Sequence, residues 1–346
     1  MKKEIESSKL SLRQHPFTGI RIVLCFILLI GAIPPSFAHD GDNRSKDKFY
    51  LSLGDSLSVG VQPDAAGVNQ RTDDGYPDQL FNILSEEEKN LRLVKLGCEN
   101  RETTENMISG GGCFYEKGSQ LAQAVKFLRK HRDDVALITI DIGVNDVIFS
   151  GCIIETDGIV TGVDVGCILD PDGGPFAQVA ANLPIILSTL QQAAGDDTPI
   201  VALNYYNTFL ASWLTGTDGQ VLAEQSALLA SILNNDVLGQ TYAAFSIPVA
   251  DVAGAFDSDN FTDVVPFPTP GSPYMIPQNV ALICLWTYMC VPEPVGPNIH
   301  ANPTGYGVIA ATIEQVLPAD GNDHYRNDHK HNDHKHDDRH HDRHDN

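Results

Sequence analysis

The chain has 346 residues, 42% of them hydrophobic, and a formal net charge of −22 at pH 7. The hydrophobic content is sufficient for a sizeable core. The acidic balance argues against nucleic acid as a partner, because phosphate binding needs a basic surface, and otherwise indicates only solubility.

The first 38 residues have the parts of a secretory signal peptide. A basic leader precedes the apolar run IVLCFILLIGAI, and Ser36 and Ala38 supply small residues for cleavage after Ala38. The run is shorter than the ~20 residues of a spanning helix, although an uncleaved anchor stays open as an alternative. We therefore expect a secreted protein, extracellular or periplasmic, in which residues 39–47 form a loose N-terminal segment.

Beyond the leader, short apolar runs alternate with helical patterns. The runs are predicted strands at residues 49–53, 91–96, 135–140, 200–204 and 247–252. The helical patterns cover residues 77–87, 118–132, 176–194, 219–245 and 303–317. This alternation predicts an α/β fold, a three-layer α/β/α sandwich around a mostly parallel five-stranded sheet, within a domain at residues 48–318.

Two segments interrupt the alternation. Residues 150–175 carry Cys152 and Cys167 with many Asp and Gly residues, which indicates a stapled loop. Residues 255–297 are rich in proline and aromatic side chains, and they form either a loop with a small core of its own or a wall of a substrate pocket.

The cysteines that follow the leader fall into three local pairs, Cys98/Cys113, Cys152/Cys167 and Cys284/Cys290. Each pair closes a short loop, and an oxidising compartment favours disulfides. Sequential pairing is our expectation among several possible connectivities. Zinc binding is the weaker alternative, because no Cys-x-x-Cys motif occurs.

The C-terminal segment 319–346 consists almost entirely of His, Asp, Asn, Lys and Arg, and a segment that cannot bury apolar surface is expected to be disordered. It either binds a divalent metal weakly or is a solvated tail that gains positive charge as the pH falls through ~6.5. The candidate metal ligands are His329, His331, His334 and His336.

Polar clusters follow two of the predicted strands. Gly-Asp-Ser ends the first, at Ser56, and Gly-Val-Asn-Asp ends the third, at Asn145. Ligands of parallel sheets bind beyond the carboxyl ends of the strands, so these side chains are candidates for one site. A serine nucleophile needs a base. Outside the leader, the start of the mature chain and the tail, the candidates are His131, on the charged end of a helix, and His300, in the loop expected before the last helix. His300 is therefore the predicted base.

These blocks resemble the SGNH (GDSL) hydrolase family of lipases and esterases. GDSLS at 54–58, GVND at 143–146 and IHAN at 299–302 match its order and spacing over about residues 48–318, and NIHANPTGYGVIA is similar to secreted bacterial members. The resemblance implies a flavodoxin-like sheet and ester hydrolysis without metal or cofactor. Ser56 would be the nucleophile and His300 the base, while Asn145 and the Ser56 N–H would bind the oxyanion. Asp55 and Gly143 lie in the same blocks as supporting positions.

Two positions depart from the family pattern. Arg101 stands where the family has a glycine whose N–H joins the oxyanion hole. Pro297 stands where the family usually has an aspartate that orients the histidine, so that Asn298, or a backbone carbonyl between Trp286 and Val291, is left to orient His300.

The predicted function is a secreted serine esterase or lipase that hydrolyses acyl esters through an acyl-serine intermediate. A phospholipase or acyltransferase on the same Ser-His pair is the first alternative. A non-enzymatic metal-binding protein that acts through its tail is the second. The expected partner is an acyl ester or lipid, no cofactor is expected, and the chain is expected to be a monomer.

Overall fold

The computed structural model describes residues 46–156, 159–267 and 274–317. The predicted signal peptide, residues 39–45 and the His-rich tail with His329, His331, His334 and His336 lie outside these residues. Within the described ranges, no helix is long and apolar enough to cross a membrane. No group of His, Cys, Asp or Glu side chains in the same ranges is arranged to hold a metal ion.

The core of the fold is a parallel five-stranded sheet in the order β4-β1-β5-β8-β9. Its strands are β1 (Lys48–Gly54), β4 (Leu91–Lys95), β5 (Val135–Asp141), β8 (Ile200–Leu203) and β9 (Val249–Ala250). All five coincide with predicted strands, and the α/β fold class is confirmed. The last strand is much shorter than predicted. It lies at the edge of the sheet and follows Pro248, which has no N–H for a ladder.

The order of the strands creates a switch point at the centre of the sheet. The chain leaves β1 towards β4 on one side and later returns to β5 on the other side of β1. This is the flavodoxin-like order, in which ligands bind between the carboxyl ends of the first and third strands. The two polar clusters noted in the sequence follow these two strands.

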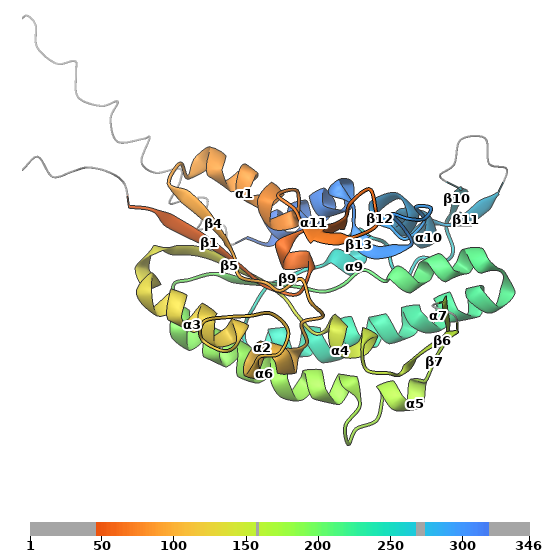
Figure 1. The fold of residues 1–346 in the computed structure, drawn as a ribbon, viewed down its shortest axis with the longest axis horizontal. Helices are drawn as coiled ribbons and strands as arrows, with labels where there is room; N and C mark the ends of the chain where they lie inside the picture. The colour runs from red at the N-terminus through yellow and green to blue at the C-terminus, as the bar shows by residue number, and fades with distance from the viewer. Residues whose placement is uncertain (1–45, 157–158, 268–273, 318–346) are drawn as a thin grey trace, which may run out of the picture. The chain divides into compact units, whose positions relative to one another are not determined.

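Helices cover both faces of the sheet. Figure 1 shows α1 (Tyr76–Glu87) and α11 (Pro303–Val316) above it and α3 (Gln120–Lys130) and α6 (Pro175–Ala194) below it. The other helices are α2 (Thr104–Ser109), α4 (Val144–Ile148), α5 (Val165–Ile168), α7 (Thr217–Ser231), α8 (Gln240–Ala244), α9 (Val252–Ala255) and α10 (Gln278–Trp286). A π-helical segment at Ile232–Gly239 joins α7 to α8, and 3₁₀ turns lie at Leu57–Val59, Arg132–Asp134 and Thr208–Thr215.

The helix starts follow ordinary capping chemistry. The Asn302 side chain accepts a hydrogen bond from the Gly305 N–H at the start of α11, and Pro303 occupies its first turn. The Ser119 side chain caps α3 in the same way by accepting from the Ala122 N–H. The Asn302 cap starts α11 three residues after His300.

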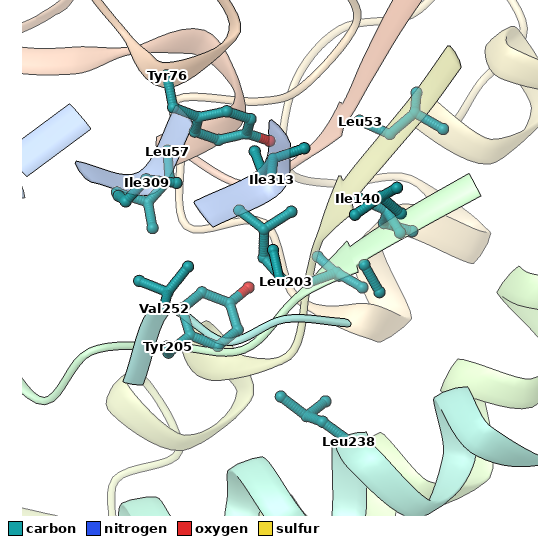
Figure 2. Close-up of a cluster of buried hydrophobic side chains, with 14 of the residues drawn as sticks. Leu53, Leu57, Tyr76, Ile140, Leu203, Tyr205, Leu238, Val252, Ile309 and Ile313 are labelled. Atoms are coloured by element: carbon teal, nitrogen blue, oxygen red, sulfur yellow. The ribbon is translucent and has the colours of Figure 1, made fainter. Parts of the chain in front are cut away.

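The core lies on both faces of the sheet. Figure 2 shows Leu53, Ile140 and Leu203 from the strands among Tyr76, Ile309 and Ile313 from the helices. All six side chains are buried. Because both faces are covered, the strands read as nearly continuous apolar runs, which is why the sequence predicted them well.

The smaller strands pair in antiparallel hairpins or ladders outside the main sheet. They are β2 (Val61–Pro63) with β3 (Asn69–Arg71), β6 (Ile153–Thr156) with β7 (Ile159–Val163), β10 (Val264–Pro266) with β11 (Met275–Pro277), and β12 (Thr287–Tyr288) with β13 (Asn298–Ala301). The segment 150–175, predicted as a loop, therefore contains the β6–β7 hairpin and α5. Its sequence lacks the regular alternation of apolar and polar residues that identifies a hairpin.

Disulfides join Cys98 to Cys113, Cys152 to Cys167 and Cys284 to Cys290. The middle one closes the segment that carries β6, β7 and α5. In the Pro- and aromatic-rich segment, Phe256 is fully buried, stacks on Tyr206 and meets the Trp286 ring edge-on. Phe256, Ile276, Val280 and Ile283 belong to the same buried core as the sheet, so the segment packs onto the domain and does not form the small core of its own that was one of the two alternatives.

Candidate active site

Ser56 lies directly beyond the end of β1, at the switch point of the sheet. Its backbone has φ −63° and ψ −27°, and it begins the 3₁₀ turn Leu57–Val59. Gly54 has φ 131°, and a Cβ at that position would lie 1.9 Å from the carbonyl oxygen of Asp141. Glycine is therefore required where β1 passes β5, and the turn that follows leaves the Ser56 side chain half-buried.

His300 reaches Ser56 from the far end of the chain. Its Nε2 lies 2.9 Å from the Ser56 Oγ, across 244 residues of sequence. The sequence placed His300 in a loop, and this was wrong: it lies in β13, which pairs with β12 outside the main sheet. The β12–β13 pairing was missed because its two strands are very short and prolines separate them.

The other ring nitrogen of His300 contacts Asn298. The Nδ1 atom lies 2.6 Å from the Asn298 Oδ1, and the same oxygen accepts the backbone N–H of His300 at 3.1 Å. A backbone N–H can only donate, so the atom facing it is the amide oxygen. The Nδ1 therefore carries the ring proton and donates it to Asn298. The Nε2 is left as an acceptor for the Ser56 hydroxyl.

His300 is buried, with 6% of its surface exposed. Burial lowers its pKa to about 4. The imidazole is therefore neutral at ordinary pH, the form in which it can accept a proton.

Asn145 lies in α4, directly after β5, and is buried. Its Nδ2 donates to the backbone carbonyl of Glu102 at 3.0 Å, which uses one of the two amide protons. The next residue, Asp146, accepts from the Thr104 hydroxyl at 2.6 Å and from the Thr104 N–H at 2.9 Å. These bonds attach α4 to the segment that contains Glu102, so the orientation of the Asn145 amide is well defined.

Gly143 and Arg101 both adopt positive φ. Gly143 has φ 124° before α4, where a Cβ would lie 3.3 Å from both Val179 and Leu238. Arg101 has φ 45°, a left-handed conformation that favours glycine. The Arg101 side chain is exposed, and its guanidinium lies 4.3 Å from the centroid of the Phe149 ring. The guanidinium thus stacks on a neighbouring ring, and within the described residues no hydrogen bond or ion pair joins it to Ser56 or His300.

Behind Ser56 lies a buried group of acidic and phenolic side chains. Asp55 accepts from the Leu57 N–H at 3.0 Å and from the Tyr205 hydroxyl at 3.1 Å, and burial raises its pKa to about 6. Asp141 accepts from the Tyr76 hydroxyl at 2.6 Å and from the Asp55 N–H at 3.0 Å. Burial, and then the neighbouring Asp55, raise the pKa of Asp141 well above its usual value.

These two carboxyl groups hold the turn that carries Ser56 against β5. Sequence reasoning named Asp55 and missed Asp141, Tyr76 and Tyr205. The signal available for Asp141 was an acidic residue inside the apolar run LITIDIG. The two tyrosines gave no comparable signal, because their partners are distant in sequence.

An apolar cavity of about 60 Å³ lies beside this group. Its walls include residues of α4, the β6–β7 hairpin, α6, α7 and the π-helical segment, among them Val144, Ile153, Val163, Phe176, Leu229 and Leu233. Val144 adjoins Asn145, and Tyr205 contacts both the cavity and Asp55. Ser56, Asn145 and His300 do not line the cavity themselves, and Val144 and Tyr205 connect it to their surroundings. No residue of the segments 255–267 and 274–297 lines it.

No protein-family model matches the chain, and no curated protein matches its sequence. Solved structures similar to it include a phospholipase A1 from Streptomyces albidoflavus NA297, at 17% identity and a TM-score of 0.46 over 79% of this chain and 100% of that chain. An extracellular lipase from Streptomyces rimosus has 17% identity and a TM-score of 0.45, over 77% and 99% of the two chains. An aryl esterase from M. smegmatis has 15% identity and a TM-score of 0.43, over 78% and 98%.

Proposed function

We propose that the protein is a secreted serine ester hydrolase of the SGNH type, which cleaves carboxylic esters through an acyl-serine intermediate. The observation that carries this proposal is the 2.9 Å contact between the Ser56 Oγ and the His300 Nε2. A neutral imidazole with an unprotonated Nε2 is the base that a serine hydroxyl needs in order to attack a carbonyl.

The reaction begins when His300 takes the Ser56 proton at Nε2 as Oγ bonds to the ester carbonyl carbon. Collapse of the tetrahedral intermediate breaks the bond to the alcohol oxygen, which leaves with the proton from Nε2. A water molecule then repeats the sequence: His300 takes its proton, the hydroxide attacks the acyl carbon, and the acid leaves as Ser56 regains its proton.

The tetrahedral oxyanion needs donors aimed at it. Asn145 retains one amide proton after its bond to the Glu102 carbonyl. The Ser56 N–H belongs to the same residue as the attacking oxygen and is therefore close to the reacting carbon. The Arg101 guanidinium has no part in this step, because it stacks on Phe149.

Asn298 gives the base its orientation without a charge. A carboxylate at this place would stabilise the imidazolium that forms during attack, whereas an amide oxygen stabilises it only through its dipole. We therefore propose a Ser-His pair oriented by an amide, with a slower chemical step than a triad with an aspartate.

The substrate class is an ester with an apolar acyl chain, which includes lipids. The apolar cavity beside the site supports this class, because a flexible hydrocarbon chain gains free energy by leaving water for such walls. The three disulfides support export to an oxidising compartment. Cleavage after Ala38 and metal binding by the tail remain predictions.

The test is hydrolysis of p-nitrophenyl esters by the mature chain and by its Ser56→Ala variant. The variant should lose at least about 10³-fold in kcat, the scale expected when a nucleophile is removed. Ser85→Ala, a half-exposed serine of α1, is the matched control and should retain full activity. Turnover by Ser56→Ala at the native rate would mean that another group attacks the ester.

A further inference from the structure

We propose that Asn69 is a positioning residue for the base, an inference that rests on the proposed function. The Asn298 Nδ2 donates to the Asn69 Oδ1 at 2.7 Å. Asn69 thereby adds a fourth member to the hydrogen-bonded series Asn69–Asn298–His300–Ser56. It has no contact with the reacting atoms and acts through Asn298.

The role follows from the hydrogen-bonding inventory of the Asn298 amide. Its oxygen already accepts from the His300 backbone N–H and from Nδ1. Its nitrogen has only donors, so it needs an acceptor on the opposite side, which Asn69 supplies. If the amide turned by half a rotation, its N–H groups would face two other donors and leave Nδ1 without an acceptor. Nδ1 could then lose its proton to Nε2, and Nε2 could no longer take the Ser56 proton.

The bond also strengthens the acceptor that faces His300. A hydrogen bond donated by an amide nitrogen polarises the amide and makes its oxygen more negative. The imidazolium that forms during attack is therefore better stabilised when Asn69 is in place. This partly replaces the carboxylate that the site lacks.

The β2–β3 hairpin places Asn69 and ties it to both halves of the site. At its start, the Val61 N–H donates to the Ser56 carbonyl at 3.0 Å. On its flank, the Tyr288 hydroxyl donates to the Gln62 Oε1 at 2.9 Å, which links β2 to β12. At its tip, a Cβ on Gly67 would lie 1.8 Å from the Pro294 carbonyl oxygen, so the hairpin lies directly against the loop before β13.

The expected effect is modest, because Asn69 is exposed and Asn298 half-buried. Water competes for the Asn298 N–H when Asn69 is removed. Asn69→Leu should lower kcat about fivefold at unchanged KM, the scale of one neutral hydrogen bond. Asn69→Asp keeps an acceptor and should retain kcat. Its negative charge favours the protonated imidazole, so the acidic limb of its pH–rate profile should lie at higher pH than in the native chain.

The experiment measures kcat, KM and the pH–rate profile of the mature chain and of its Asn69→Leu, Asn69→Asp and Asn298→Ala variants, together with the double variant Asn69→Leu/Asn298→Ala. Gln70→Ala is the matched control, because Gln70 is exposed on the same strand and points to the opposite face from Asn69. Melting temperatures show whether each variant keeps its fold. Because Asn69 acts through Asn298, Asn69→Leu should cause no further loss once Asn298 is alanine.

Unchanged kcat in Asn69→Leu would overturn the inference, and so would an equal loss on the native and Asn298→Ala backgrounds. A loss in kcat matched by Gln70→Ala would also overturn it, since that result indicates a general effect of the hairpin. Failure of the proposed function is distinguishable, because it would appear as full turnover by Ser56→Ala, whatever the Asn69 variants do.

Discussion

Replacing Asn298 by aspartate tests the orientation of the base directly. In the native chain the atom 2.6 Å from the His300 Nδ1 is a neutral amide oxygen. Asn298→Asp is nearly isosteric and puts a carboxylate oxygen at the same place. The second carboxylate oxygen meets Asn69, whose exposed amide can rotate to present its N–H group.

The magnitude follows from the distance and the burial of the pair. Two unit charges separated by about 4 Å attract by roughly 4 kcal/mol at an effective dielectric constant near 20. An opposite charge within about 4–6 Å shifts the pKa of an ionisable group by about one to three units. His300 must be neutral to act as the base, and burial holds its pKa at about 4. The acidic limb of kcat/KM, which reports the free enzyme, should therefore rise from near pH 4 by about two to three pH units.

The assay is a pH–rate profile of ester hydrolysis from about pH 3 to 9, with the released alcohol measured by chromatography so that the readout does not depend on pH. On the alkaline side kcat should increase in Asn298→Asp, because a charged partner stabilises the imidazolium better than an amide. Asn298→Ala is the comparison variant and should lower kcat. A profile of Asn298→Asp that superimposes on the native one would refute the assignment of Asn298 as the group that orients His300.

Three other predictions test the surroundings of the site. Burial raises the pKa of Glu102 from 4.5 to about 7, so the stability that comes from its protonated form is lost as the pH rises through about 7. Glutamine does not titrate, so the unfolding free energy of Glu102→Gln relative to the native chain should increase as the pH is raised from about 4 to about 8. An equal pH dependence of denaturant stability in the two proteins would contradict this. The Cys152–Cys167 disulfide joins residues separated by 15 positions in sequence. Replacing both cysteines with serine should lower the unfolding free energy by about 3 kcal/mol, measured as a lower urea midpoint. An unchanged midpoint would show that the bridge is not structural. Ala230→Phe adds a ring to the cavity wall and should shift the substrate preference towards esters with shorter acyl chains. The measurement is kcat/KM over a series of acyl chain lengths. An unchanged preference would place the acyl chain elsewhere.

The sequence predicted the strands of the main sheet and the Ser56–His300 pair that meets at its edge. Buried parallel strands are apolar on both faces, so their runs stand out from the amphipathic helices between them. Ser56 and Asn145 stood out because each is in a polar cluster that ends such a run. His300 was found by excluding the histidines of the leader, the start of the mature chain and the tail. The strand that contains it was not predicted.

Other features depended on contacts between distant segments. The β12–β13 pair is too short for its sequence to have a strand pattern of its own, and it brings His300 to Ser56. Asn69 and Asn298 are 229 residues apart, and nothing local to either one indicates that they share a hydrogen bond. The raised pKa values of Asp55 and Asp141 likewise come from burial by elements that are distant in sequence, which outweighs the lowering by the hydrogen bonds from Tyr205 and Tyr76.

The sequence by itself determined the strands of the main sheet and which chemical groups lie at their ends, because periodicity and polarity are local properties of the chain. The tertiary structure alone decided which nitrogen of His300 carries the proton, that Asn298 rather than a backbone carbonyl contacts its ring, and which carboxyl groups have raised pKa values. These properties depend on distances of a few ångströms between side chains that only the packed fold brings together.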